Sequence, residues 1–283
     1  MRKWRGKHNH LPRRVGEYII NALMIGGLIA KHSYKLGLQG ELGVTRYALA
    51  LPEGKRLSLP LRIAFASDFH AGPTTHPKVF DHLCDEILKE DPDLLLLGGD
   101  FVSYDHRYIQ VLSTVFACLS PPLGKYAVFG NHDLWVDDTE LAAMLSTAGV
   151  EILVNRNVAL PTPYEGISIC GLDDPWTGSA DADKTFDDTQ AIRLLLMHAP
   201  DGLLLLHEHR YDLAFAGHTH GGQITLGNGT PILVPGGPLG RKYCHGLFDI
   251  ENNGSLIVSR GIGCSTLPIR LNAHPELVIC TLY

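Results

Sequence analysis

The sequence lacks the cysteine pairs that form structural zinc sites. Its cysteines are scattered along 283 residues, and none belongs to a CxxC pair: Cys84, Cys118, Cys170, Cys244, Cys264 and Cys280. This spacing argues against a cysteine-based zinc site. It predicts buried free thiols in a reducing compartment instead.

An excess of positive charge is also missing. Lys and Arg together number 24 against 30 Asp and Glu, so the formal net charge is −6. This balance argues against a broad basic surface, and no extended nucleic-acid interface is expected. A hydrophobic content of 45% with 19% charged residues is typical of a globular chain with a substantial core.

The N-terminal region has no apolar run of the roughly 20 residues that a membrane-spanning helix needs. A basic segment, residues 1–14, precedes a shorter apolar stretch at residues 18–30. Three interpretations compete: an anchor lying on anionic lipid, an export signal, or a helix packed on the domain. We favour the anchor, which predicts a peripheral protein on the cytoplasmic face of the membrane, with export as the alternative. Residues 1–40 are then a separate segment, and 41–283 form one domain.

Apolar runs alternate with helical periodicity in the first half of the chain. We expect an edge strand at 44–52, helices at 76–93, 106–124 and 137–150, and buried strands at 61–68, 93–100, 125–133 and 150–155. This order predicts parallel strands joined by crossover helices. Short strands dominate from Gly166 onward, with one helix expected at 183–192, so the second half should form a second sheet.

Polar residues follow five of the expected strands, at the end where open α/β sheets bind ligands. In chain order they are Asp68 and His70, then Asp100, then Asn131, His132 and Asp133, then His198, and finally His218 and His220. Taken singly, each motif could be a turn or a histidine satisfied in the core. Five in order, each closing an apolar run, favour one shared site.

The donor types at these strand ends suit a divalent metal. Carboxylate, amide and imidazole ligands bind Mn, Fe or Zn. Glycines allow tight turns and close backbone approach around them, at positions 98, 99, 130, 217, 221 and 222. Seven ligands exceed the need of one ion, and they suit two ions about 3.5–4 Å apart with one bridging carboxylate.

From Arg62 to His220 this order of motifs resembles the calcineurin-like metallophosphoesterase superfamily. The resemblance implies an α/β fold, a two-sheet αββα sandwich, with two divalent ions, for which Mn is favoured over Fe or Zn. It implies that the first ion is bound by Asp68, His70 and His220, and the second by Asn131, His198 and His218, with Asp100 bridging. His132 would be catalytic, donating a proton to the leaving oxygen.

The implied reaction is hydrolysis of a phosphodiester or pyrophosphate bond by metal-activated hydroxide. The tail, residues 259–282, is similar to a bacterial branch with N-terminal membrane or export segments. That branch includes phosphodiesterases and UDP-2,3-diacylglucosamine pyrophosphatase. A lipid-linked substrate such as UDP-2,3-diacylglucosamine, and a role in lipid A biosynthesis, are therefore expected. The alternatives are a soluble nucleotide phosphodiesterase and a non-catalytic metal-binding module.

The chain departs from the family pattern after Asp100. Protein phosphatases of the superfamily carry GDxVDRG, in which the second Asp orients the catalytic histidine and the Arg grips phosphate. Ser103 and Tyr104 stand at those positions here. The missing Arg argues against a phosphoprotein phosphatase, and the missing Asp leaves Asp133 or Asp105 as carboxylate partners for His132. Arg270 and Asn272 are expected either to reach substrate phosphate or to have a structural role.

Overall fold

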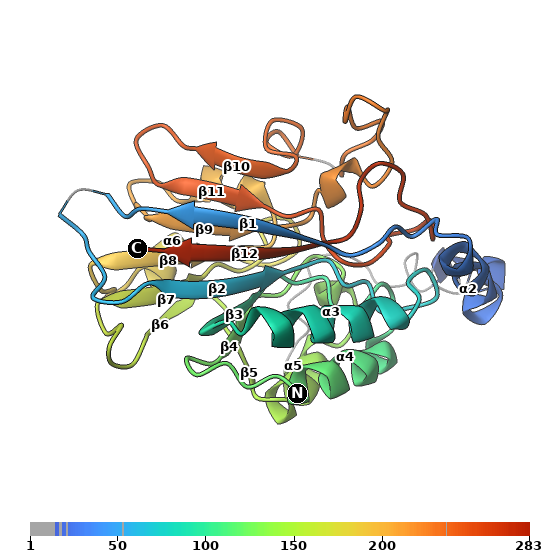
Figure 1. Ribbon diagram of the computed structural model, residues 1–283, viewed down its shortest axis with the longest axis horizontal. Helices are drawn as coiled ribbons and strands as arrows, with labels where there is room; N and C mark the ends of the chain where they lie inside the picture. The colour runs from blue at the N-terminus through green and yellow to red at the C-terminus, as the bar shows by residue number, and fades with distance from the viewer. Residues whose placement is uncertain (1–14, 17–18, 21, 53, 236) are drawn as a thin grey trace.

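The computed structural model of the chain describes residues 15–283 apart from residues 17, 18, 21, 53 and 236. Two six-stranded sheets pack face to face, and three long helices cover the outer face of the first (Figure 1). This arrangement is the two-sheet sandwich that the resemblance implies.

The first sheet has the strand order β1–β12–β2–β3–β4–β5. The bounds are β1 Gly43–Leu49, β2 Leu61–Ala66, β3 Leu94–Leu97, β4 Lys125–Ala127, β5 Val150–Ile152 and β12 Glu276–Leu282. The predicted parallel order of β2 to β5 and the predicted edge strand β1 are confirmed. The expectation that the whole second half builds the second sheet is wrong for β12. This nearly all-buried strand lies between β1 and β2, where apolar residues are needed on both faces.

The second sheet has the order β10–β11–β9–β8–β7–β6. The bounds are β6 Arg156–Ala159, β7 Ile167–Gly171, β8 Ile192–Leu196, β9 Leu213–Ala216, β10 Gly246–Asp249 and β11 Ser255–Val258. The strands β7, β8, β9 and β11 run parallel, and β6 and β10 pair antiparallel at the two edges. The edge strand β6 was not predicted, because its half-exposed residues give no apolar run.

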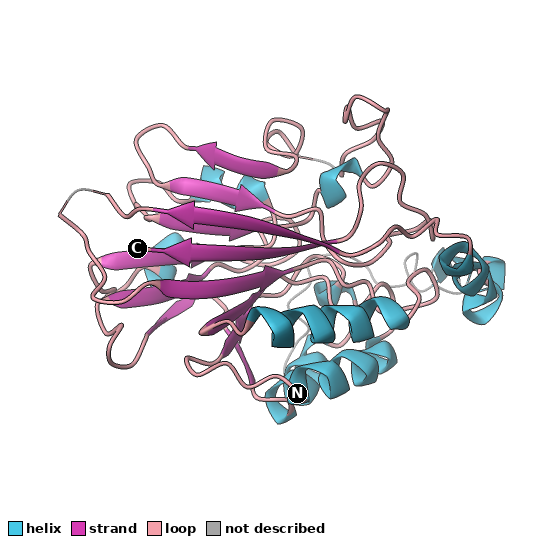
Figure 2. Cartoon of the chain, in the orientation of Figure 1, coloured by secondary structure: helices cyan, strands magenta, loops and turns pink. Residues whose placement is uncertain are grey.

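Helices cover the two sheets unequally (Figure 2). The first sheet carries α3 Lys78–Glu90, α4 Ile109–Ala117 and α5 Asp138–Thr147. The second carries one turn, α6 Ala182–Thr185, and the 3₁₀ segment η4 Pro200–Leu205. The predicted helix at 183–192 is therefore wrong in length. The chain takes a left-handed conformation at Asp188, and β8 begins at Ile192. Further short 3₁₀ segments are η2 His106–Tyr108, η3 Asp133–Trp135 and η5 His220–Gly222.

The main core lies between the sheets. Leu61, Ile63 and Phe65 of β2 point into it, and the ring of Phe65 lies 5.2 Å from that of Phe215 on β9. Burying each such side chain stabilises the fold by about 1.5–3 kcal/mol. The sheets are therefore fixed relative to each other, and the carboxyl ends of strands from the two sheets are held close together.

The described part of the apolar stretch near the N-terminus is not one continuous helix. The 3₁₀ segment η1 Ile25–Gly27 precedes α2 Leu28–Lys35, and positive φ angles at Ile25, Gly26 and Gly27 interrupt the helical path. Within the described residues no helix is long and apolar enough to cross a membrane. The expectations for residues 1–14 and for Tyr18 lie outside the described part, and the domain boundary at residue 40 stays a prediction.

All six cysteines are free. Cys170, Cys264 and Cys280 are buried as the sequence predicts, whereas Cys118 is exposed. Burial raises the pKa of the Cys170 and Cys280 thiols to about 12, so these thiols are inert at neutral pH.

Candidate metal centre

The polar residues that follow the strands meet where the carboxyl ends of strands from the two sheets come together. Pairing between β2 and β3 continues past the strands, because the amide of Asp68 donates to the carbonyl of Gly99 and that of His70 to Asp100, both at 2.9 Å. His198, which follows β8 of the other sheet, has Nδ1 2.8 Å from the carbonyl of Gly98. This contact connects the two sheets directly beside the cluster.

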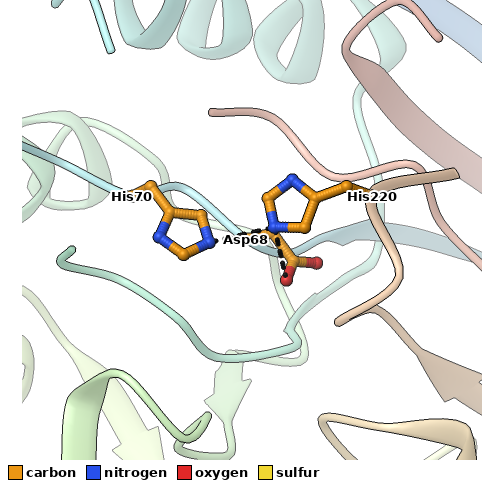
Figure 3. A group of neighbouring side chains, drawn as sticks. All are labelled: Asp68, His70 and His220. Atoms are coloured by element: carbon orange, nitrogen blue, oxygen red, sulfur yellow. Dashed lines mark hydrogen bonds and ion pairs between the residues drawn. The ribbon is translucent and has the colours of Figure 1, made fainter. Parts of the chain in front are cut away.

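Asp68, His70 and His220 form the first half of the cluster (Figure 3). The Nε2 atoms of His70 and His220 are 3.0 Å apart, and Nε2 of His220 lies 3.5 Å from Oδ1 of Asp68. All three side chains are buried. Two imidazole nitrogens and a carboxylate oxygen thus converge on one point.

Asn131, His198 and His218 form the second half. Nε2 of His198 lies 3.2 Å from Oδ1 of Asn131 and 3.2 Å from Nδ1 of His218. Asp100 lies between the halves, with Oδ2 3.5 Å from Nε2 of His70 and 3.4 Å from Nε2 of His198. The structure therefore brings all seven predicted ligands together, while their roles as ligands stay a prediction.

The spacing of these atoms fits metal coordination. Donors about 2.1 Å from an ion lie about 3.0–3.4 Å from one another in octahedral or tetrahedral geometry. The donor–donor distances above fall close to this range. His198 also makes the hydrogen bond that metal-binding histidines make through their second ring nitrogen. A carbonyl at Nδ1 selects the tautomer whose Nε2 can bind metal. The residues present fit a divalent ion in each half.

The backbone is left-handed at most of the predicted ligands. Positive φ angles, between 44° and 69°, occur at Asp68, His70, Asp100, His218 and His220. Asp and His tolerate this conformation better than most residues, but it still costs on the order of 1–3 kcal/mol each. Strain gathered at one cluster is typical of a functional site.

Two glycines are required for the side chains to converge. A Cβ atom at Gly217 would lie 2.2 Å from Oδ2 of Asp68, and one at Gly130 would lie 2.2 Å from Oδ1 of Asp100. Any side chain there would displace a carboxylate of the cluster. The sequence expectation of close approach at these glycines is confirmed.

Burial and neighbouring charges shift the pKa values of the carboxylates in the cluster. Burial, reinforced by the charge of Asp100, raises the pKa of Asp68 to about 6. Burial opposes ionisation of Asp100 too, but the imidazoles of His198, His132 and His70 outweigh it and hold its pKa well below the usual range. Buried carboxylates without a cation are costly, so this donor set suits a bound cation.

The pKa values of the buried histidines shift in opposite directions. Burial, with the nearby charge of His132, lowers the pKa of His70 well below its usual value, and burial with His70 and Arg270 does the same for His220. Both rings are therefore neutral, the form that binds metal. Burial opposes protonation of His198, but Asp100 and Asp68 outweigh it and raise its pKa.

His132 lies at the edge of the cluster. Its ring centroid is 4.7 Å from that of His70 and 4.1 Å from that of Trp135. Its Nδ1 lies 2.7 Å from the backbone carbonyl of Ser103, and its amide donates to Oδ1 of Asp100 at 2.8 Å. The ring is thus oriented by a carbonyl that follows Asp100 by three residues.

The two carboxylates considered as partners for His132 have other contacts. Both oxygens of Asp133 accept backbone amides, at 2.8 Å from Phe101 and 2.9 Å from Gly130. Asp105 pairs with Arg107 at 2.6 Å. Ser103, at the position of the family's orienting Asp, supplies the contact through its main chain, which a side-chain pattern does not reveal.

Arg270 and Asn272 have structural contacts. The guanidinium of Arg270 is buried, donates to the carbonyl of Gly263 at 2.6 Å, and has Nη2 3.2 Å from Nδ1 of His220. Asn272 donates to the carbonyl of Thr225 at 3.0 Å. Arg270 therefore fixes the position of His220.

Asp174 was not among the residues predicted from the sequence. This buried carboxyl follows β7, accepts the amide of Thr177 at 2.6 Å, and lies close enough to His198 for their charges to interact. Burial, opposed by His198, raises its pKa to about 6. Its position just after a buried strand is the sequence signal that could have identified it.

The structure is a two-sheet sandwich with groups of candidate metal-binding side chains. The chain belongs to the calcineurin-like phosphoesterase family, whose profile matches residues 61–222. It is 32% identical over 204 residues to the metallophosphoesterase YkuE of Bacillus subtilis strain 168, covering 69% of this chain and 70% of that protein. It is 29% identical over 229 residues to the phosphodiesterase YaeI of Escherichia coli K12, covering 79% and 82%.

The fold is also similar to that of a 5'-nucleotidase precursor from Thermus thermophilus. The TM-score is 0.46 at 13% identity, covering 79% of this chain and 54% of that one. Family membership identifies the protein as a metal-dependent phosphoester hydrolase, and the clustered side chains are its candidate metal ligands.

Proposed function

We propose that the protein hydrolyses a phosphodiester or pyrophosphate bond with two divalent ions held by the seven clustered residues. The observation that carries this proposal is the position of Asp100, whose Oδ2 lies within 3.5 Å of a histidine nitrogen in each half. Two ions, when bound, supply hydroxide at neutral pH and charge that binds phosphate oxygens. We favour manganese, although the same donors also accept iron or zinc.

His132 is the proposed proton donor. The Ser103 carbonyl accepts the Nδ1 proton, so Nε2 is the nitrogen that delivers a proton to the leaving oxygen. A positioned imidazole of this kind accelerates a reaction about 10²–10⁴-fold. The ring stands beside the cluster, with its centroid 4.7 Å from that of His70.

A diester suits this site better than a phosphomonoester. Tyr104 stands where the family's protein phosphatases carry the phosphate-gripping Arg, and its ring centroid is 5.5 Å from that of His132. A monoester dianion needs more positive charge than a diester monoanion. The name of the similar YaeI as a phosphodiesterase supports the same choice.

We further propose that the substrate is linked to lipid and that the protein rests on the cytoplasmic face of the membrane. Leu23, Ile25 and Leu28 are exposed in the N-terminal segment, and Lys31 follows them on α2. Exposed apolar side chains beside basic ones favour an anionic bilayer surface. UDP-2,3-diacylglucosamine, and with it a role in lipid A biosynthesis, is the specific candidate.

The substrate proposal is tested by hydrolysis with added Mn²⁺. Bis(p-nitrophenyl) phosphate is compared with UDP-2,3-diacylglucosamine in detergent micelles. We expect turnover of both, with kcat/KM at least about tenfold higher for the lipid, because the lipid adds binding energy outside the reacting bond. Cleavage of the soluble diester alone would instead favour a nucleotide phosphodiesterase. A protein that binds Mn²⁺ but cleaves neither would be a binding module.

Membrane contact is tested with the full-length chain, because Ala30 and Ser33 of α2 are buried in the domain and a deletion would disturb it. The triple variant Leu23→Ser, Ile25→Ser, Leu28→Ser should lower the fraction sedimenting with phosphatidylglycerol vesicles by at least about tenfold. Each apolar side chain buried in the interface contributes on the order of 1.5 kcal/mol.

The matched control for this variant replaces exposed leucines on other elements: Leu59→Ser, Leu88→Ser and Leu204→Ser. This variant should sediment with vesicles like the wild type. Equal loss in both triple variants, or none in either, would contradict the anchor.

A further inference from the structure

An apolar cavity of about 650 Å³ adjoins the metal centre. His220 belongs both to the predicted ligand set and to the lining of this cavity. The apolar wall consists of Ile224, Ile232, Leu233, Val234, Pro235 and Leu267. Of the lining residues that the structure describes, none is Asp, Glu, Lys or Arg.

The wall of the cavity is held in place by hydrogen bonds. Nε2 of Gln223 donates to the carbonyls of Ser265 and Leu267, both at 3.0 Å, and its Oε1 accepts the amide of Ser265 at 2.8 Å. The main chain of Leu271 pairs with Gln223 and Thr225, both at 2.9 Å. The Gln223 amide group thus already has partners, and the cavity presents mainly hydrocarbon to an occupant.

The mouth of the cavity exposes apolar side chains to an unusual degree. Ile232 is 60% exposed, Leu233 74% and Leu267 47%. The loop that carries Leu267 is also tied to the N-terminal segment, because the hydroxyl of Ser33 donates to the carbonyl of Pro268 and the amide of Arg270 to that of Leu38. Figure 1 shows α2 and the loop before β12 at the same end of the molecule.

We propose that this cavity binds the hydrocarbon chain of the substrate, and this inference rests on the proposed lipid-linked function. A chain joined to a phosphate at the cluster reaches the cavity past His220, the residue common to both. The volume lies within the roughly 300–1,000 Å³ of small-molecule sites. A nucleobase or sugar would need hydrogen-bonding partners, which the apolar wall does not offer.

The test is a homologous series of p-nitrophenyl alkyl phosphates with butyl, hexyl, octyl and decyl chains. The leaving group is constant, so chain length alone changes. KM of the wild-type protein should fall up to about fourfold per added methylene, the equivalent of about 0.8 kcal/mol. The double variant Leu233→Asp, Leu267→Asp should flatten this dependence of KM on chain length.

Leu88→Asp is the matched control, because Leu88 is an exposed leucine of α3 outside the cavity lining. It should retain the wild-type dependence on chain length. Calorimetric titration of the Mn²⁺-loaded protein with decyl phosphate measures the same preference without turnover. We expect binding to the wild type and to Leu88→Asp, and at least tenfold weaker binding to the double variant.

The outcomes separate the two proposals. No turnover of any diester would refute the proposed function, and the titration alone then decides the inference. Turnover with a KM that is independent of chain length overturns the inference and leaves a phosphodiesterase. A dependence that survives in the double variant also overturns it, because the chain then binds elsewhere. If the double variant changes only the sedimentation coefficient of the protein, the apolar wall is a surface between copies of the chain. This result also overturns the inference.

Discussion

Asp100→Asn is expected to remove at least one equivalent of bound divalent metal and to lower kcat by about 10³-fold or more. Asp100 is the predicted ligand whose carboxylate lies within 3.5 Å of a histidine nitrogen in each half of the cluster. An amide offers one neutral oxygen and cannot bridge two ions. Loss of metal-derived charge stabilisation costs several kcal/mol in the transition state, and each 1.36 kcal/mol is a factor of ten.

Asparagine is the informative replacement at this position. The residue has φ of 52°, a conformation that Asn adopts readily and Ala does not. Its side-chain oxygen still accepts the amide of His132, which Oδ1 of Asp100 does at 2.8 Å. The variant should therefore fold, and loss of metal can be attributed to the lost charge. Metal content is measured by inductively coupled plasma mass spectrometry after gel filtration.

Asp201→Asn is the control for this experiment. Asp201 is buried, accepts the amide of Leu239 at 3.1 Å, and belongs to none of the candidate metal-binding groups of the described residues. It should retain wild-type metal content and turnover. Two equivalents of metal in Asp100→Asn would contradict the bridging role.

The strand ends explain why the centre could be predicted from sequence. A buried strand is a continuous apolar run, and the first polar residues after it mark its carboxyl end. Asp68 and Asp100 were located this way, and so was the pair His218 and His220. Parallel strands bring these ends together whatever the details of the connections.

What the sequence could not predict depends on long-range contacts. The sequence pattern of β12 is similar to that of the other short strands. Only its position between β1 and β2 explains why both of its faces are buried. The orienting contact of His132 comes from a backbone carbonyl, which every residue carries. The packing of Arg270 against His220 joins residues 50 positions apart. Contacts between residues so far apart leave no periodic pattern in the local sequence.

His132→Ala is expected to keep the wild-type metal content and to lower kcat by about 10²-fold on an alkyl diester, because a proton donor is lost. The backbone amide that reaches Asp100 remains in this variant. The loss should be smaller on bis(p-nitrophenyl) phosphate, since nitrophenolate leaves without being protonated. This difference between leaving groups separates a proton donor from a residue that only shapes the site.

One ring nitrogen of His132 lies within 4.8 Å of ligand atoms of His70 and Asp100, so a role as a metal ligand is the rival interpretation. A ligand role predicts that His132→Ala loses metal and slows both esters equally. His106→Ala controls for loss of an imidazole nearby, because His106 follows Asp100 in the chain and pairs with Glu140 at 3.2 Å. It should change neither quantity. Retained metal with a loss confined to the alkyl ester would assign proton donation to His132, and equal slowing with retained metal would assign it to another group.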